Sequence, residues 1–188
     1  LYPSDAVSTA KLVEKMYGVE GVSYMRTTRE KTRVLYKDED TFEIGGSKVL
    51  RSSADDMLTP VGAGITLHEC LKAHDELKAQ GIHVRVIDLY SIKPIDAKTL
   101  TTAARETGTL IVVEDHWPEG GMGDAVLDAF TPKGPVTRGG KVVSLDILPK
   151  IVKIAVRDMP GSGTPEELMD AAGITSSHIV ATVKSLVS

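Results

Sequence analysis

The chain of 188 residues has a single cysteine, few aromatic residues and no long apolar run. With Cys70 alone, neither an intrachain disulfide nor a cysteine-based zinc cluster can form, and such usage is typical of a reducing cytoplasm. No apolar stretch approaches the roughly 20 residues that span a bilayer, and the first residues lack the basic-then-apolar pattern of a secretion signal. We therefore expect a soluble, cytoplasmic protein with no membrane partner.

The sequence also lacks a basic run. Its 22 basic and 26 acidic residues give a formal net charge of -4, and lysine and arginine do not cluster as they do in proteins that follow a phosphate backbone. Four histidines are scattered without metal-ligand spacing: His68, His74, His83 and His178. We expect neither a nucleic-acid partner nor a metal site.

What is present is an alternation of strand and helix patterns. Apolar runs at 57–64, 82–89, 109–115 and 150–156 predict strands, and segments 66–81, 96–106, 123–130, 165–173 and 176–187 predict helices. The run TLIVVED is almost wholly apolar at its centre, which is typical of a parallel strand covered on both faces. The sequence predicts an α/β fold of three layers, α/β/α, with an open, mostly parallel sheet.

The first 34 residues do not complete a domain. They are predicted to form a turn, one helix and a strand from Val22 to Thr27, and a helix and a strand alone cannot bury their apolar faces. We interpret residues 1–34 as the remnant of a domain whose remainder is cut off or supplied by another polypeptide. Residues 35–51, polar and containing Gly45 and Gly46, are predicted to be a linker, and residues 52–188 the main domain.

The stretch VEDHWPEGGMGDAV, residues 113–126, is the most prominent candidate for an interface or ligand loop. Its residues of interest are two acids, a histidine, a tryptophan and three glycines: Glu114, Asp115, His116, Trp117, Gly120, Gly121 and Gly123. The loop follows a strand, where ligands of open α/β sheets bind, and precedes a helix whose amino-terminal N–H groups can hold an anion. The favoured interpretation is structural: a sharp bend whose tryptophan packs and whose charges face water or a neighbouring subunit. An acid and a histidine without a nucleophile predict no catalytic residue.

Two other glycine motifs are weaker. VGAGITL is similar to a dinucleotide fingerprint, but Leu67 replaces the third glycine, although Asp88 lies near the distance of the ribose-binding acid. PGSGTPEEL lacks the lysine of a phosphate loop. We expect both to be loops that begin helices.

Three stretches together resemble the carboxyl-terminal part of transketolase: GAGITLHECLKAHDELKAQGIHVRVIDLYSIKPID, IVVEDHWPEGGMGDAV and DMPGSGTPEELMDAAGI. The first is shared by the wider thiamine-diphosphate superfamily, and SGxPxELM, from Ser162 to Met169, favours transketolase itself. YPSDAVSTAKLVE and YMRTTRE resemble the last helix and strand of the pyrimidine-binding domain of that enzyme.

The resemblance implies a transferase of the pentose phosphate pathway. The complete enzyme would move a two-carbon ketol unit from a ketose phosphate to an aldose phosphate, as a homodimer that uses thiamine diphosphate and magnesium or calcium. The GDG motif and the glutamate-bearing part of the pyrimidine domain are missing, so we expect no cofactor, metal or catalytic residue in this chain and no activity without upstream catalytic domains. The main domain is expected to be structural and to contribute to the dimer.

The same resemblance implies one site residue. Arg29 of YMRTTRE would bind the phosphate of the sugar substrate, a task that suits the planar donors of a guanidinium, and Arg26 is the alternative position. Three other interpretations stay open. The chain could belong to another thiamine-diphosphate enzyme, such as a 2-oxoacid dehydrogenase beta subunit or deoxyxylulose-phosphate synthase. It could also be a nucleotide- or phosphate-sensing module, or the small subunit of a split transketolase.

Overall fold

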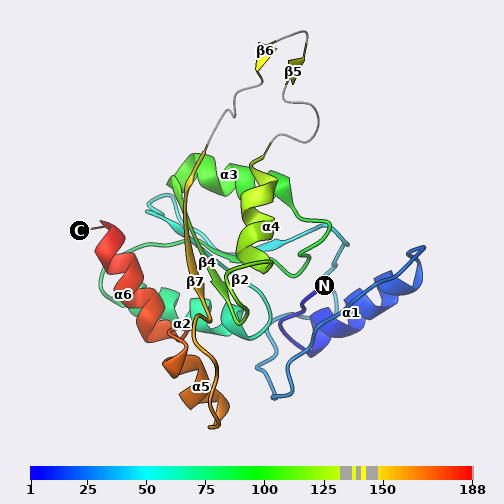
Figure 1. Ribbon diagram of the computed structural model, residues 1–188, viewed down its shortest axis with the longest axis horizontal. Coiled ribbons are helices and arrows are strands. Elements are labelled where there is room, and N and C mark those ends of the chain that lie inside the picture. Colours follow the sequence, from blue (N-terminus) through cyan, green and yellow to red (C-terminus); the bar gives the residue numbers. More distant parts are fainter. Residues whose placement is uncertain (132–136, 139–140, 143–147, 188) are drawn as a thin grey trace.

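A five-stranded sheet forms the centre of the molecule (Figure 1). The computed structural model describes residues 1–131, 137–138, 141–142 and 148–187. The strands are β1 (Lys48–Arg51), β2 (Thr59–Gly62), β3 (Val86–Asp88), β4 (Thr109–Glu114) and β7 (Lys150–Ala155), in the order β1-β3-β2-β4-β7. Strand β1 is antiparallel to β3, and the other pairs are parallel. The predicted open, mostly parallel sheet is confirmed. A separate two-stranded sheet pairs β5 (Thr137–Arg138) with β6 (Lys141–Val142).

Helices cover both faces of the central sheet. On one face α2 (Ile65–Ala79) and α6 (Ser176–Val187) share a core with the side chains of β3, β4 and β7, including Val86, Ile111 and Ile154. On the other face α3 (Ala97–Thr107) and α4 (Met122–Ala129) pack on Leu110 and Val112. Alternate residues of β4 thus enter opposite cores, as the pleat of a strand requires. The predicted three-layer arrangement is confirmed.

Local sequence signals set the ends of these helices. Asp96 caps α3, because its side chain accepts a hydrogen bond from the Thr99 N–H at 3.0 Å. Thr164 and Glu167 form a capping box around the start of α5 (Pro165–Ala171). Gly108 ends α3 with a left-handed φ of 68°. The helices predicted at 66–81, 96–106, 123–130, 165–173 and 176–187 are all present, with bounds that differ by a few residues.

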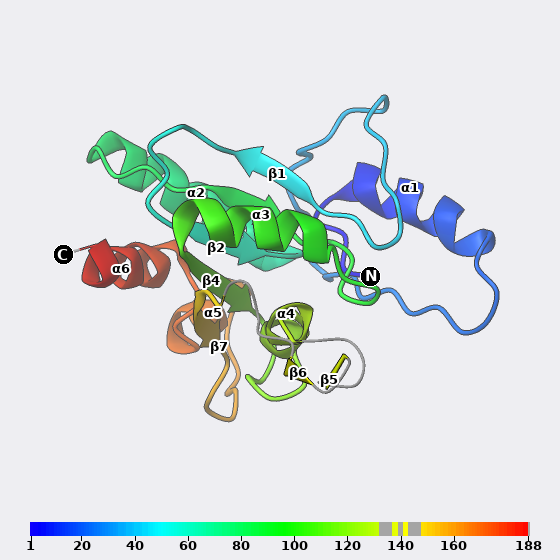
Figure 2. The same ribbon diagram turned by 90° about the horizontal axis from the view of Figure 1, so that it is seen from above.

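Residues 1–36, the N-terminal arm, extend to one end of the molecule, and α1 (Ala6–Tyr17) and α6 lie at opposite ends in both ribbon views (Figure 2). The strand predicted from Val22 to Thr27 is wrong. This segment, all of which the structure describes, is extended but belongs to no sheet. Its backbone meets Leu1 through two hydrogen bonds, Leu1 N–H to the Tyr24 carbonyl at 2.8 Å and Arg26 N–H to the Leu1 carbonyl at 2.9 Å. A strand needs a neighbouring strand to form a ladder, and none lies beside it here.

The segment predicted to be a linker has structure of its own. Tyr36 and Phe42 are buried with Leu12 of α1 and with Tyr90, and the ring of Phe42 meets those of Tyr36 and Tyr90 edge-on at 4.8 and 5.1 Å. This small core joins the arm to the sheet. Residues 48–51 form β1. The assignment of residues 35–51 to a linker between domains stays a prediction.

Candidate functional site at the carboxyl edge of the sheet

A cavity of about 640 Å³ lies where the N-terminal arm meets the loops that follow β2 and β4. The arm contributes apolar side chains and one arginine, and the sheet side contributes acids, a histidine and the start of α4. Its lining includes Tyr2, Tyr24, Arg26, Glu114, Asp115 and His116. The cavity therefore lies at the carboxyl ends of parallel strands, the place at which open α/β sheets bind ligands.

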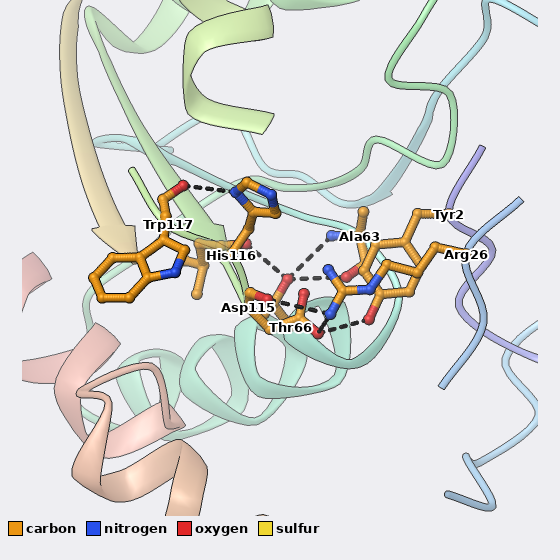
Figure 3. A network of polar contacts seen from close by, with 8 residues as sticks. Tyr2, Arg26, Ala63, Thr66, Asp115, His116 and Trp117 are labelled. Carbon is orange, nitrogen blue, oxygen red and sulfur yellow. Dashed lines mark hydrogen bonds and ion pairs between the residues drawn. The ribbon is translucent and has the colours of Figure 1, made fainter. Parts of the chain in front are cut away.

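Asp115 lies at the centre of a polar network between the arm and the sheet. Figure 3 shows the side chains of Tyr2 and Arg26 converging on it. The Tyr2 hydroxyl donates to Asp115 Oδ2 at 2.9 Å, and a guanidinium nitrogen of Arg26 donates to the same oxygen at 2.8 Å and to the Asp115 carbonyl at 3.2 Å. The guanidinium also lies over the Tyr2 ring, 4.9 Å from its centroid. Burial and the negative charge of Asp115 raise the pKa of Tyr2, so the hydroxyl stays protonated and acts as the hydrogen-bond donor.

Glu114 occupies the amino terminus of α4. Its side chain is 3% exposed, and Oε2 accepts from the Gly123 N–H at 3.2 Å. A Cβ on Gly121 would lie 2.1 Å from Glu114 Oε2, and one on Gly123 would lie 2.7 Å from Oε1. The glycines predicted to cradle an anion thus leave room for a carboxylate of the chain itself. Burial raises the pKa of Glu114, although hydrogen bonds from the backbone of Gly123 and Met122 lower it in part. The second carboxylate oxygen, Oε1, is buried and has no partner within the described residues.

His116 and Trp117 lie on the outer side of this loop. The His116 ring donates from Nδ1 to the Trp117 carbonyl at 2.8 Å, since a carbonyl can only accept (Figure 3). Trp117 is 41% exposed, and the His116 carbonyl accepts from the Val156 N–H at 3.0 Å, which ties the loop to the end of β7.

The dinucleotide-like motif VGAG is covered by the arm. Gly64 has φ 55° and precedes α2, and a Cβ on it would lie 2.1 Å from the ring of Tyr2. The ring of Tyr2 stands where a ligand would approach the amino terminus of α2. His68 extends this contact, because its Nε2 lies 2.7 Å from the Ser4 carbonyl. The loop begins a helix, as predicted, and here it also receives the arm.

A second polar network is fully buried beneath the arm. Asp88, at the end of β3, accepts hydrogen bonds from the Ser4 hydroxyl at 3.0 Å and the Tyr36 hydroxyl at 2.6 Å. Burial raises the pKa of Asp88 to about 7 in spite of these two donors. Asp5 accepts from the backbone N–H groups of Leu35 and Tyr36, at 2.7 and 3.0 Å. Both ends of the arm are thus fastened to the end of β3.

Arg29 lies apart from these networks. It is exposed at a bend, and within the described residues it makes no hydrogen bond or ion pair. Arg26, the alternative position, is committed to Asp115. The structure therefore separates the two arginines: one joins the arm to the sheet, and the other is free to meet a molecule from outside.

The described residues contain no group of three or more His, Cys, Asp or Glu that could hold a metal ion. His74 pairs with Asp75, and His178 lies near Asp170 and Thr175. Cys70 is buried in the core beside α6. No helix in the described ranges is both long and apolar enough to cross a membrane.

Sequence reasoning missed Tyr2, Tyr36 and Ser4 as parts of the site. Tyr2 lies 113 positions before Asp115 and Tyr36 lies 52 before Asp88, so no local spacing connects them. The signal that was available was Gly64, whose missing side chain predicts a close approach by another group.

The chain is similar to known transketolases along its whole length. Residues 47–179 match the family model described as "Transketolase, C-terminal domain". The chain is 47% identical to transketolase-like protein 2 of Mus musculus over 187 residues. This alignment covers 99% of the chain and 28% of that protein. It is 40% identical to the transketolase of Mus musculus over 100% of the chain and 28% of that protein. The chain thus spans little more than a quarter of the relatives that it matches.

Solved structures give the same result. A structure described as "Split gene transketolase, inactive beta4 tetramer" has a TM-score of 0.82 and 32% identity, and it covers 97% of this chain and 55% of that one. The transketolase of Campylobacter jejuni has a TM-score of 0.72 at 16% identity, covering 98% of this chain and 25% of that one, and supports the fold alone.

Proposed function

The chain belongs to the transketolase C-terminal domain family, and on that premise we propose that it is the carboxyl-terminal portion of a transketolase. The complete protein would transfer a two-carbon ketol unit from a ketose phosphate to an aldose phosphate in the pentose phosphate pathway. One observation carries this proposal: the identity to curated transketolases runs along the whole chain and includes the N-terminal arm. The sequence motifs SGxPxELM and VEDHWPEGGMG lie on the matched segment.

Neither helix amino terminus at the cavity fits the diphosphate group of thiamine diphosphate. The amino terminus of α4 is filled by Glu114 and that of α2 is covered by Tyr2, so neither has room for a diphosphate. No cluster of carboxylates within the described ranges is suited to a divalent cation. We propose that upstream catalytic domains supply both groups, and that the chain alone is inactive. Ketol transfer by the purified chain would overturn this part of the proposal.

We further propose that residues 1–34 belong to the pyrimidine-binding domain, and residues 52–188 to a carboxyl-terminal domain packed against it. Val22 and Tyr24 are exposed on the extended segment that lacks a strand partner, at 103% and 75%. In a complete protein, neighbouring strands of the upstream portion would pair with this segment and cover these side chains. The loop at 113–121 then forms a contact between domains, because Asp115 accepts hydrogen bonds from Tyr2 and Arg26 of the arm.

Arg29 is proposed to bind the substrate phosphate. Support comes from its exposure and from the engagement of Arg26 elsewhere. In the complete protein, Arg29→Ala should raise the KM of phosphorylated substrates by about 10- to 100-fold, because hydrogen bonds to a charged group contribute about 1.5–3 kcal/mol. Arg33→Ala, a change in another exposed arginine of the same segment, is the matched control. Unchanged kinetics of the Arg29 variant would remove this assignment.

We also propose that the complete protein is a cytoplasmic homodimer. The lone buried thiol is consistent with a reducing compartment. Trp117 is exposed beside charged residues, which gives the loop at 113–121 the composition of an interface. Light scattering on the complete protein and on a Trp117→Ala variant tests the dimer: a monomeric complete protein excludes it, and an unaffected variant dimer excludes the loop from the contact.

A further inference from the structure

We infer that Asp115 is a positioning residue for substrate phosphate binding, because it holds through Arg26 the segment of the arm that carries Arg29. This inference rests on the proposed function and extends it to a residue of the carboxyl-terminal domain. It gives the acidic part of the loop at 113–121 a role in substrate recognition without contact with the substrate.

The arm is fastened to Asp115 by two side chains that reach one carboxylate oxygen. Tyr2 and Arg26 donate to Oδ2 at 2.9 and 2.8 Å, and Arg26 also reaches the carbonyl of the same residue (Figure 3). Tyr2 is itself fixed at its backbone, because its N–H donates to the Tyr90 carbonyl at 2.8 Å. The guanidinium stacks on the Tyr2 ring. The orientation of the Arg26 side chain is therefore set by three contacts: the Asp115 carboxylate, the Asp115 carbonyl and the ring of Tyr2, which is itself hydrogen bonded to Asp115.

Asp115 is in turn held by the sheet. It follows β4, which pairs with β2 on one side and β7 on the other. The preceding residue, Glu114, is anchored at the amino terminus of α4, and the following residue, His116, is hydrogen bonded to Val156. Because Asp115 is held rigidly, it can fix the position of Arg26 in the more loosely held arm.

Arg29 lies between two fastened points of the arm. Arg26 is the first, assisted by the partly buried Met25 in the small aromatic core. Leu35 and Tyr36, bound to Asp5, are the second. Arg29 lies three positions after Arg26, a span of at most about 11 Å, so a shift of the first point moves the arginine directly. Release of Arg26 would leave Arg29 on a longer free segment and weaken its binding of phosphate.

The test uses the complete protein and two aldose acceptors that differ only in the presence of the phosphate. Asp115→Asn keeps the shape and removes the charge that holds Arg26. We expect the KM of the phosphorylated acceptor to rise about three- to tenfold, in line with a partly exposed ion pair, with kcat unchanged. The KM of the acceptor without phosphate should stay the same. Asp115→Glu, which keeps the charge, should restore the KM, and Glu119→Gln, an exposed acid of the same loop, is the control.

A purely structural role of Asp115 would change both acceptors alike. Parallel changes in the two KM values, a fall in kcat alone, or no change at all would overturn the inference. If Arg29→Ala raises the KM and Asp115→Asn does not, the proposed function stands and the positioning role fails.

A second measurement does not depend on activity. Trypsin cleaves after arginine, so the rates of cleavage after Arg26 and Arg29 in this chain report how firmly the segment is held. We expect Asp115→Asn to be cleaved at these bonds several times faster than the unchanged chain and Glu119→Gln to be cleaved at the original rate. Equal rates in all three would overturn the positioning role even if the complete protein transferred no ketol unit.

Discussion

Glu114 and Gly121 approach so closely that residue 121 has no space for a side chain: a Cβ there would lie 2.1 Å from Glu114 Oε2 and 2.8 Å from the Trp117 carbonyl. The two residues lie seven positions apart, one at the end of β4 and one just before α4. Their contact places a carboxylate at the positive end of the helix, where it is stabilised by the helix dipole and by the Gly123 N–H. The acid that precedes the loop thus explains Gly121 and Gly123, whereas Gly120 is required by its left-handed φ of 71°.

Gly121→Ala tests this contact. We expect the free energy of unfolding to fall by about 1–3 kcal/mol, the usual cost of forcing extra atoms into a packed site. Gly121 has φ -89°, a value that alanine adopts freely, so the loss would report the steric contact alone. Urea denaturation followed by circular dichroism measures it. Gly161→Ala, where no atom lies within 4 Å of the added Cβ, should change stability by less than about 1 kcal/mol.

Asp88 gives the fold a dependence on pH. Burial raises its pKa from 3.8 to about 7, so the folded chain binds a proton that the unfolded chain releases between these values. Its stabilising contribution is fully present below pH 3.8 and is lost as the pH rises toward 7, with a slope of at most about 1.4 kcal/mol per pH unit. The groups that face it are Ser4, Asp5, Tyr36, Lys48 and Tyr90.

Asp88→Asn should remove that slope. Urea denaturation from pH 4.5 to 7.5, a range of about the width of the shift, would show a flatter profile for the variant than for the unchanged chain. Asp158→Asn, in an exposed position, should keep the original profile. Identical slopes for the Asp88 variant and the unchanged chain would assign the pH dependence to other groups.

Phe42 connects the arm and the sheet. Its ring is 1% exposed between Tyr36 and Tyr90, and truncation to alanine should lower the free energy of unfolding by about 3–5 kcal/mol. Val22→Ala, at a fully exposed position, should change it by less than about 0.5 kcal/mol. A small effect at Phe42 would mean that residues 35–47 behave as a flexible linker in solution.

Cys70 should be unreactive in the folded chain. Burial, followed by the nearby Glu69 and Asp88, raises the pKa of its thiol, so both access and thiolate formation are suppressed. A colorimetric thiol reagent should therefore report almost no free thiol under native conditions and one per chain in denaturant. Rapid native reaction would show that the core around α2 opens readily.

The layers of the fold could be predicted because the helices that cover the sheet and its four parallel strands carry their own patterns, whereas β1, in the segment predicted to be a linker, was missed. Asp96 before α3 and Gly81 after α2 are local signals, and the apolar centre of β4 reveals burial on both faces. The strand predicted from Val22 to Thr27 was wrong for the opposite reason, because its formation depends on residues outside the segment. Its β-branched and aromatic residues are typical of a strand, but a strand also needs a partner strand, and the described residues place none beside this segment.

The site was predicted only in outline. The composition of residues 113–126 and their place after a strand predict an interface or ligand loop. The partners of this loop were not predicted, because Tyr2 and Arg26 reach Asp115 across a long separation in sequence. The carboxylate at the start of α4 was also missed, since a motif of glycines before a helix predicts an anion without identifying it as Glu114.

The pairing of a bulky group with an absent side chain also limits how the sequence can diverge. Tyr2 fills the space that Gly64 leaves, and Glu114 fills the space that Gly121 leaves. A smaller residue at position 2 or 114 would still not admit a side chain at its partner, because Gly64 has a left-handed φ of 55° and a Cβ on Gly121 would also lie 2.8 Å from the Trp117 carbonyl. Both glycines should therefore be kept across evolution even where residues 2 and 114 differ.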